Sequence, residues 1–115
     1  MAHRVLVVDD EVQVAKSIQL LLRGARFEVA IACDGPSALA ILDEFAPDLV
    51  ISDFRMPVMN GAELVRAIRQ RRPATLCLLL SGYVGIESVD CECLAKPFET
   101  RALLATIKQR LGVAS

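Results

Sequence analysis

The chain has 115 residues, enough for one domain with one hydrophobic core and too few for two. Hydrophobic residues make up 54% of it, which permits a thoroughly buried sheet, and its net charge of −1 argues against a nucleic-acid-binding surface. No apolar stretch approaches the roughly 18 residues of a membrane span, and the apolar residues 5–8 near the N-terminus are too few for a signal peptide. We expect a soluble cytoplasmic protein that contacts neither nucleic acid nor membrane directly.

The cysteines, four in number, lack the spacing of a metal site. Cys77 lies in an apolar run, where a thiol packs as a small hydrophobic group. Cys91 and Cys93 are separated by one residue, whereas zinc-ligand pairs are separated by about two to four. We interpret these cysteines and Cys33 as packing residues, and the single histidine, His3, as incidental.

Strand-like and helix-like segments alternate along the chain. The expected strands are short apolar runs bounded by polar residues, and they cover 5–8, 27–32, 49–52, 75–80 and 91–95. The expected helices carry apolar residues at helical spacing, and they cover 11–23, 34–45, 60–72 and 99–111.

Polar residues mark several of the helix ends. Asp10 is placed to cap the first helix, and Asn60 with Glu63 has the spacing of a capping box at the start of the third. Three arginines (69, 71 and 72) fall at the end of that third helix. A basic cluster there could bind an anionic partner, but complementing the helix dipole is the interpretation we favour.

This alternation predicts an α/β fold, a flavodoxin-like doubly wound sheet of five parallel strands in the order 2-1-3-4-5 with helices on both faces. Ligands of such sheets bind beyond the carboxyl ends of the strands, where the strand order reverses. For this order, that point lies between the first and third strands.

Chemistry-bearing residues follow the strand ends: Asp9 and Asp10 after the first, Asp53 after the third, Ser81 after the fourth and Lys96 after the fifth. Clustered carboxylates repel unless a cation or a proton lies among them. Oxygen ligands of this kind suit Mg²⁺, a lysine beside a hydroxyl suits a phosphoryl group, and an aspartate can itself be the nucleophile. Because no glycine-rich phosphate loop follows the first strand, we expect the phosphoryl group to come from a donor.

These residues, in this order, resemble the receiver domain of two-component response regulators. The likeness covers almost the whole chain, so a single receiver domain over 1–115 is expected. It is carried by Asp9–Asp10, Asp53, the loop 56–61, Ser81–Gly82 and Lys96–Pro97–Phe98.

The resemblance implies a set of site roles. Asp53 would accept a phosphoryl group from a histidine kinase or phosphotransfer protein, in a signalling pathway or phosphorelay that ends on a downstream protein partner. Asp10, Asp53 and the backbone carbonyl of Arg55 would bind Mg²⁺ or Mn²⁺, and Asp9 would act through water.

The resemblance also implies roles beside the phosphoacceptor. Lys96 would contact the phosphoryl group, and Ser81 would donate a hydrogen bond to it, with Gly82 leaving room. The Lys96–Pro97 peptide bond would be cis, a geometry largely restricted to bonds before proline.

Two features depart from the family pattern. Cys93 stands where receivers usually place Tyr or Phe, three residues before the lysine, so an aromatic switch is missing. Only fourteen residues separate Ser81 from Lys96, which predicts that the family's fourth helix is a short or irregular segment near 84–90. This shortening is similar to that of receivers attached to hybrid histidine kinases.

Two other functions compete with phosphoacceptance. One is a protein-interaction module that keeps the fold without a phosphorylation-driven switch, which the missing aromatic residue favours. The other is a phosphatase with an aspartyl phosphate intermediate, but such enzymes carry an acid/base aspartate two residues after the nucleophile. Arg55 occupies that position and cannot transfer protons at neutral pH. We therefore expect slow self-dephosphorylation at most, and no dedicated enzyme.

Tyr83, the single tyrosine, lies two residues past Ser81. We predict that Tyr83, together with Arg55, shields the phosphorylated aspartate from water. Replacing Tyr83 with Ala should then shorten the lifetime of the phosphorylated form severalfold, measured as the decay of the phosphorylated species by intact mass. An unchanged decay rate would leave Tyr83 as an ordinary loop aromatic.

Overall fold

One parallel sheet runs through the computed structural model, which describes residues 2–81, 92–95 and 99–113. Its strands are β1 (Arg4–Val8), β2 (Glu28–Ala32), β3 (Leu49–Asp53), β4 (Leu76–Ser81) and β5 (Glu92–Ala95). They lie in the order β2-β1-β3-β4-β5, and each neighbouring pair is parallel. The predicted fold class and strand order are confirmed.

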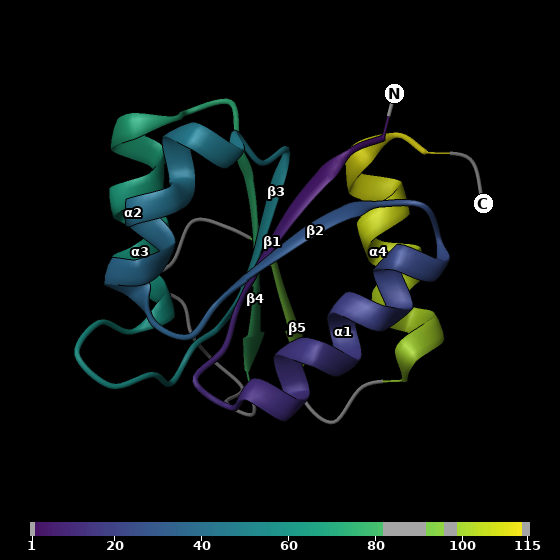
Figure 1. Ribbon diagram of the computed structural model, residues 1–115, viewed down its shortest axis with the longest axis horizontal. Helices are drawn as coiled ribbons and strands as arrows, with labels where there is room; N and C mark the ends of the chain where they lie inside the picture. The colour runs from purple at the N-terminus through teal and green to yellow at the C-terminus, as the bar shows by residue number, and fades with distance from the viewer. Residues whose placement is uncertain (1, 82–91, 96–98, 114–115) are drawn as a thin grey trace.

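Helices cover both faces of this sheet. They are α1 (Val12–Gly24), α2 (Gly35–Phe45), α3 (Gly61–Arg71) and α4 (Thr100–Leu111). Figure 1 shows α2 and α3 on one face and α1 and α4 on the other. Helix α4 is the one expected at 99–111, and the short segment expected near 84–90 lies outside the described residues.

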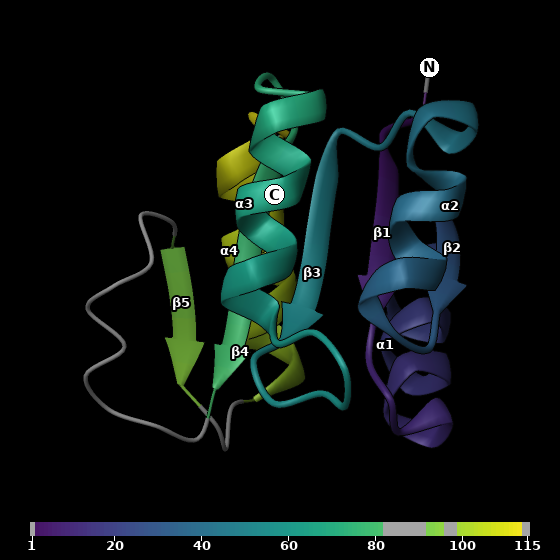
Figure 2. The ribbon, with the colours of Figure 1, turned by 90° about the vertical axis from the view of Figure 1, so that its left-hand side faces the viewer.

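Alternation along the strands divides the core into two layers. In β1, Val5 and Val7 pack with the α1 and α4 side of the core, and Leu6 and Val8 pack with the α2 and α3 side. Successive strand side chains point to opposite faces, and both faces are covered, so the strand carries an unbroken apolar run. All strands point toward one edge, where the loops of the site lie (Figure 2).

The two predicted helix caps have different outcomes. The capping box of α3 is present: the Asn60 side chain accepts from the Glu63 N–H at 2.9 Å, and the Glu63 carboxylate accepts from the Asn60 N–H at 3.0 Å. The prediction for Asp10 is wrong, because the N-cap of α1 is Glu11, without a side-chain cap bond. The helix begins one residue later than a cap at Asp10 requires. Asp9 instead accepts the Glu11 N–H at 2.9 Å.

The arginines at the end of α3 connect this helix to α2. The Arg71 guanidinium donates to Asp43 at 2.7 Å and to the Leu39 carbonyl at 3.1 Å. Arg72 lies 4.0 Å from the same Asp43 carboxylate. These two arginines therefore contribute to helix packing as well as to the charge at the helix end.

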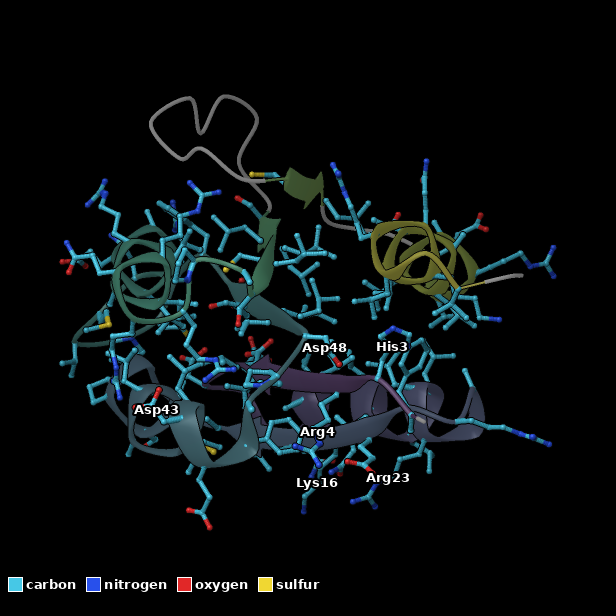
Figure 3. The ribbon with its side chains drawn as sticks, turned by 90° about the horizontal axis from the view of Figure 1, so that it is seen from above. His3, Arg4, Lys16, Arg23, Asp43 and Asp48 are labelled. Carbon is cyan, nitrogen blue, oxygen red and sulfur yellow. The ribbon has the colours of Figure 1, made fainter. Side chains whose placement is uncertain are left out.

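At the amino ends of the strands, opposite the site, charges are paired across the elements. The Arg4 backbone N–H donates to the Asp48 carboxylate at 2.8 Å, and the Arg4 side chain donates to Glu28 at 3.0 Å and to the Phe45 carbonyl at 3.1 Å. A hollow of about 470 Å³ lies beside these residues. Figure 3 shows Arg4, Asp48 and His3 at this end, and the His3 ring lies 6.5 Å from that of Phe27.

The buried layer between α3 and the sheet generates a prediction about stability. Leu64 is 0% exposed, so Leu64→Ala leaves a cavity and should lower the free energy of unfolding by about 2–5 kcal/mol. Leu20 on α1 is 76% exposed, and Leu20→Ala should change the free energy of unfolding by no more than about 0.5 kcal/mol. Urea unfolding of both variants checks the difference; equal effects would contradict the described core.

Candidate functional site

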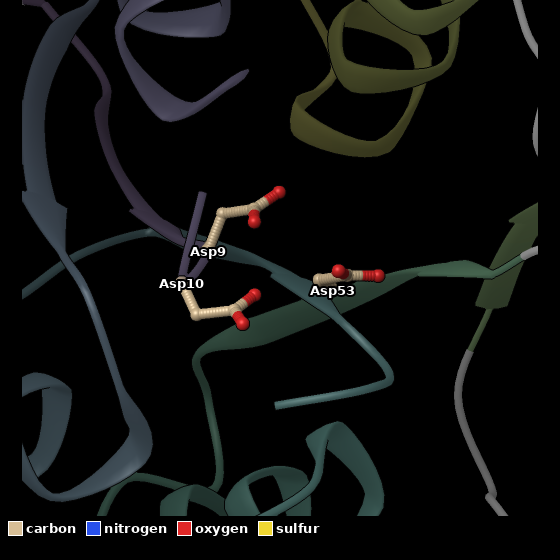
Figure 4. A group of neighbouring side chains, drawn as sticks. All are labelled: Asp9, Asp10 and Asp53. Carbon is tan, nitrogen blue, oxygen red and sulfur yellow. The ribbon is translucent and has the colours of Figure 1, made fainter. Parts of the chain in front are cut away.

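Three carboxylates meet at the carboxyl edge of the sheet. Asp9 and Asp10 directly follow β1, and Asp53 is the last residue of β3. Because β1 and β3 are neighbours with Val8 paired to Ser52, Asp9 and Asp53 come side by side. Ligand atoms of the three carboxylates all lie within 4.8 Å of one another. Figure 4 shows the three side chains as neighbours at this edge.

The donor set of this cluster fits a hard divalent cation. Asp9 is 1% exposed and Asp53 is 9% exposed, so two of the carboxylates are largely removed from water. Like charges at such separations repel unless positive charge lies among them. Carboxylate oxygens with room for water on the exposed side, where Asp10 lies, are the ligands that suit Mg²⁺.

Backbone hydrogen bonds fix Asp9 within this cluster. Its carboxylate accepts the Glu11 N–H at 2.9 Å, and its own N–H donates to the Ala32 carbonyl of β2 at 3.1 Å. The carboxylate is therefore oriented by the turn into α1. This turn leaves Asp10, which does not cap the helix, directed toward Asp53 (Figure 4).

The loop between β3 and α3 forms one wall of the site. Phe54 continues from β3, and its N–H donates to the Leu80 carbonyl of β4 at 3.0 Å. The exposed Arg55 follows it. A hollow of about 450 Å³ opens here, lined by Asp10, Phe54, Arg55, Met56, Pro57 and Asn60. The structure thus brings Arg55 and Asp10 to the same hollow.

Gly61 allows this loop to lie close to the phosphoacceptor candidate. A Cβ atom at Gly61 would come 2.7 Å from the Asp53 carbonyl oxygen and 2.7 Å from a methyl carbon of Leu79. The Gly61 N–H also donates to the Phe54 carbonyl at 2.7 Å. The sequence places Gly61 only at the junction between the loop 56–61 and the third helix. Its position directly after a helix cap and near Asp53 is the signal that a close backbone approach was needed.

Ser81 lies at the same edge of the sheet. Asp53 pairs with Leu80 across β3 and β4, so Ser81 is one position further along the neighbouring strand. It is 4% exposed. The structure therefore brings Ser81 to the edge that carries the carboxylates, as predicted.

The predicted packing role of the cysteines is confirmed for Cys77 and wrong for two others. Cys77 is partly buried, and burial raises the pKa of its thiol to about 11, so it is a packing group and stays protonated at neutral pH. The prediction is wrong for Cys33 and Cys93, which are exposed. Cys33 follows the outer strand β2, and Cys93 lies on the outer strand β5, where fewer elements cover a side chain.

The predicted site residues Gly82, Tyr83, Lys96, Pro97 and Phe98 fall outside the described part of the chain, as does Cys91, which was expected to be a packing residue. Their roles, and the cis geometry of the Lys96–Pro97 bond, stay predictions. Among the described residues, no helix is long and apolar enough to cross a membrane.

Comparisons with known proteins agree on one family. The family model described as the response regulator receiver domain matches residues 5–108. The chain is 34% identical over 117 residues to the DNA-binding response regulator MtrA of Mycolicibacterium paratuberculosis, covering 96% of this chain and 52% of that protein. The chain therefore spans about half the length of the curated relatives that it matches.

Solved structures give the same result. A CheY-like receiver domain protein from Methanospirillum hungatei superposes with a TM-score of 0.90 at 28% identity, covering 97% of this chain and 95% of that one. Chemotaxis protein CheY4 of Vibrio cholerae superposes with a TM-score of 0.87 at 34% identity, covering 95% of this chain and 98% of that one. The receiver domain of the hybrid histidine kinase CckA superposes with a TM-score of 0.82 at 35% identity, covering 94% of this chain and 98% of that one.

The close approach at Gly61 predicts a penalty for any side chain there. Gly61→Ala should lower the free energy of unfolding by about 1–3 kcal/mol, because the added methyl group collides with backbone and with a buried side chain. Gly24→Ala is the matched control, since a Cβ at Gly24 meets no atom within 4 Å. Urea unfolding of both variants measures the difference. A Gly61→Ala protein as stable as the Gly24→Ala protein would contradict the described loop.

Proposed function

The chain belongs to the response regulator receiver domain family, and on that premise we propose that Asp53 accepts a phosphoryl group from a histidine kinase or phosphotransfer protein. The observation that carries the proposal is the convergence of Asp9, Asp10 and Asp53 at one sheet edge, with Ser81 at the end of the next strand. A single receiver domain over 1–115 in the cytoplasm is part of the same proposal, and it rests on family membership.

The burial of the carboxylates favours Asp53 over Asp9 as the acceptor. Asp9 is 1% exposed and is held by the Glu11 N–H, whereas Asp53 is 9% exposed at the end of its strand. An Asp53 carboxylate oxygen would attack phosphorus as the bond from phosphorus to the donor's histidine nitrogen breaks. The donor's ring, protonated on its second nitrogen, would leave as a neutral histidine, and the other product would be an acyl phosphate on Asp53.

The cluster would hold Mg²⁺ or Mn²⁺ for this transfer. We propose that Asp10, Asp53 and the backbone carbonyl of Arg55 are the protein ligands and that Asp9 acts through water. The ion would supply positive charge that offsets the charge on the phosphoryl oxygens. The side chains would supply the geometry, because Asp9 is fixed by backbone bonds and Asp53 by the strand.

Ser81 and Lys96 are proposed to bind the transferred group, Ser81 by donating a hydrogen bond and Lys96 by its charge. Tyr83 and Arg55 are proposed to limit the access of water. Cys93 replaces the family's usual aromatic residue, and its side chain is exposed on β5. We therefore propose that the switch reaches a downstream protein partner without an inward-turning ring.

The chain is proposed to act as a phosphoacceptor and not as a dedicated enzyme, with slow self-dephosphorylation only. The name of the mycobacterial relative describes DNA binding by that protein, about half of which this chain matches. For this chain we propose protein partners and no direct nucleic-acid contact, in keeping with its net charge of −1. The alternative, an interaction module without a phosphorylation switch, is favoured by the missing aromatic residue at Cys93.

The test is phosphorylation by a small donor. We expect that incubation with acetyl phosphate and Mg²⁺ adds one phosphoryl group, detected by intact-mass analysis. Asp53→Asn should remove the adduct, because an amide is a poor nucleophile and cannot form the acyl phosphate. Chelating the metal should remove it as well.

A receiver of known activity, treated in parallel, controls for the donor. If that receiver is labelled and this chain is not, the phosphoacceptor proposal fails and the interaction-module alternative is supported. If Asp53→Asn is labelled as strongly as the unchanged chain, the acceptor has been assigned to the wrong residue.

A further inference from the structure

One contact between the β3–α3 loop and helix α2 joins Met59 and Gly35. A Cβ atom at Gly35 would lie 2.6 Å from the Met59 sulfur and 3.0 Å from both Cβ and Cγ of Met59. The sulfur could swing aside, but the Cβ atom is held by the Met59 backbone. Met59 therefore lies directly on the backbone of the first residue of α2, where only glycine leaves space.

A tight turn at Val58 brings Met59 into this position. Val58 has a φ of 72°, and the Met59 N–H donates to the Pro57 carbonyl at 2.7 Å. A hydrogen bond across one residue with positive φ is the pattern of a strained γ-turn, and positive φ is a genuine outlier for a β-branched residue. The Val58 side chain is 89% exposed, so its own packing does not hold this conformation. The contacts of the neighbouring residues hold the Val58 backbone in this conformation.

The position of Gly35 is fixed relative to the carboxylates. Asp34 caps α2 by accepting the Ser37 N–H at 2.7 Å. The Ala32 carbonyl, just before this turn, accepts the Asp9 N–H at 3.1 Å. The start of α2 is thus connected through the backbone to Asp9, and Met59 packs against Gly35 at the start of this helix.

We infer that Met59 is a positioning residue for the cation site and that its contact with Gly35 holds the Arg55 backbone over the carboxylates. The inference rests on the proposed function, since it concerns the same cation. The loop is fixed at one end by the Phe54 N–H and at the other by Gly61. Between these ends, the exposed Arg55, Pro57 and Val58 supply little packing.

Met59 is therefore one of two side-chain anchors of this loop, since Met56 and Met59 both pack against the α2 and α3 side of the core. The Met56 sulfur accepts from the Ser52 hydroxyl of β3 at 4.0 Å, whereas Met59 reaches across to Gly35 of α2. A carbonyl ligand contributes affinity only when its segment is held in the binding geometry, so loss of the anchor should weaken the site. Nothing in this step requires Met59 to touch the cation.

The experiment measures Mg²⁺ affinity directly by titrating MgCl₂ into isotope-labelled protein and following the amide spectrum by NMR. We expect Gly35→Ala to raise the Mg²⁺ dissociation constant about tenfold, as loss of supporting contacts around metal ligands does elsewhere. Gly24→Ala, the glycine with open space, should leave it unchanged. In the Met59→Ala background, Gly35→Ala should raise the dissociation constant by less than it does in the unchanged chain, because the sulfur and Cγ atoms are gone and only the Cβ atom at 3.0 Å remains.

Urea unfolding without metal shows whether each variant is folded. If Gly35→Ala does not fold, Met59→Ala replaces it, and the nearly isosteric Met59→Leu is its control. The inference is overturned if folded Gly35→Ala, or Met59→Ala in its place, binds Mg²⁺ as tightly as the unchanged chain. It is also overturned if the effects at the two positions simply add. An unchanged chain that binds no Mg²⁺ would overturn the proposed cation role itself, a result distinct from equal binding by all variants.

Discussion

Repulsion among carboxylates is the constraint on which this structure depends. Ligand atoms of Asp9, Asp10 and Asp53 lie within 4.8 Å of one another, and two of these residues are at most 9% exposed. Removing charge from water is costly unless opposite charge compensates it, so positive charge is needed at this edge of the sheet. The parallel pairing of β1 with β3 enforces the arrangement, because it aligns the ends of both strands. The proposed cation would therefore couple stability to function at this edge.

Close backbone approach is the second constraint, and glycine satisfies it on two sides of the loop. Gly61 lets the loop return onto Asp53, and Gly35 lets Met59 rest on α2. Positive φ also occurs at Arg26 and Ala46, next to helix ends, where left-handed residues commonly end helices. Val58 differs because it is β-branched and lies in the site loop. The loop is thus held in a shape that its own sequence does not favour, by contacts on either side.

The sequence predicted the strands and the carboxylates at their ends because both follow from patterns local to each strand, and the alternation of strands with helices predicted the sheet order. Apolar runs gave the strands, and polar residues at their ends gave Asp9, Asp53 and Ser81. The contact of Met59 with Gly35 could not be predicted in this way, since it joins segments whose distance depends on the assembled sheet. The cap at Asp10 was mispredicted because the capping pattern does not distinguish a helix that begins one residue later. Exposure of Cys93 likewise depends on what covers the outer strand, which composition does not reveal.

The burial of the Asp9 charge and the backbone strain at Val58 both lower stability, and they help to distinguish the two functions considered for the chain. An interaction module that only kept the fold would gain stability from an apolar residue at the buried position of Asp9 and from glycine at the strained position of Val58. The other end of the same sheet shows how this chain otherwise treats charge: Arg4 pairs with Glu28 and binds Asp48 through its backbone. Charges of opposite sign are thus paired at the amino end of the sheet, and like charges are gathered at the end where a cation and a phosphoryl group are proposed. The chain keeps the buried Asp9 carboxylate and the strained Val58 backbone at the edge that carries Asp53. This favours phosphoacceptance over an inert scaffold, even though Cys93 removes the usual aromatic switch.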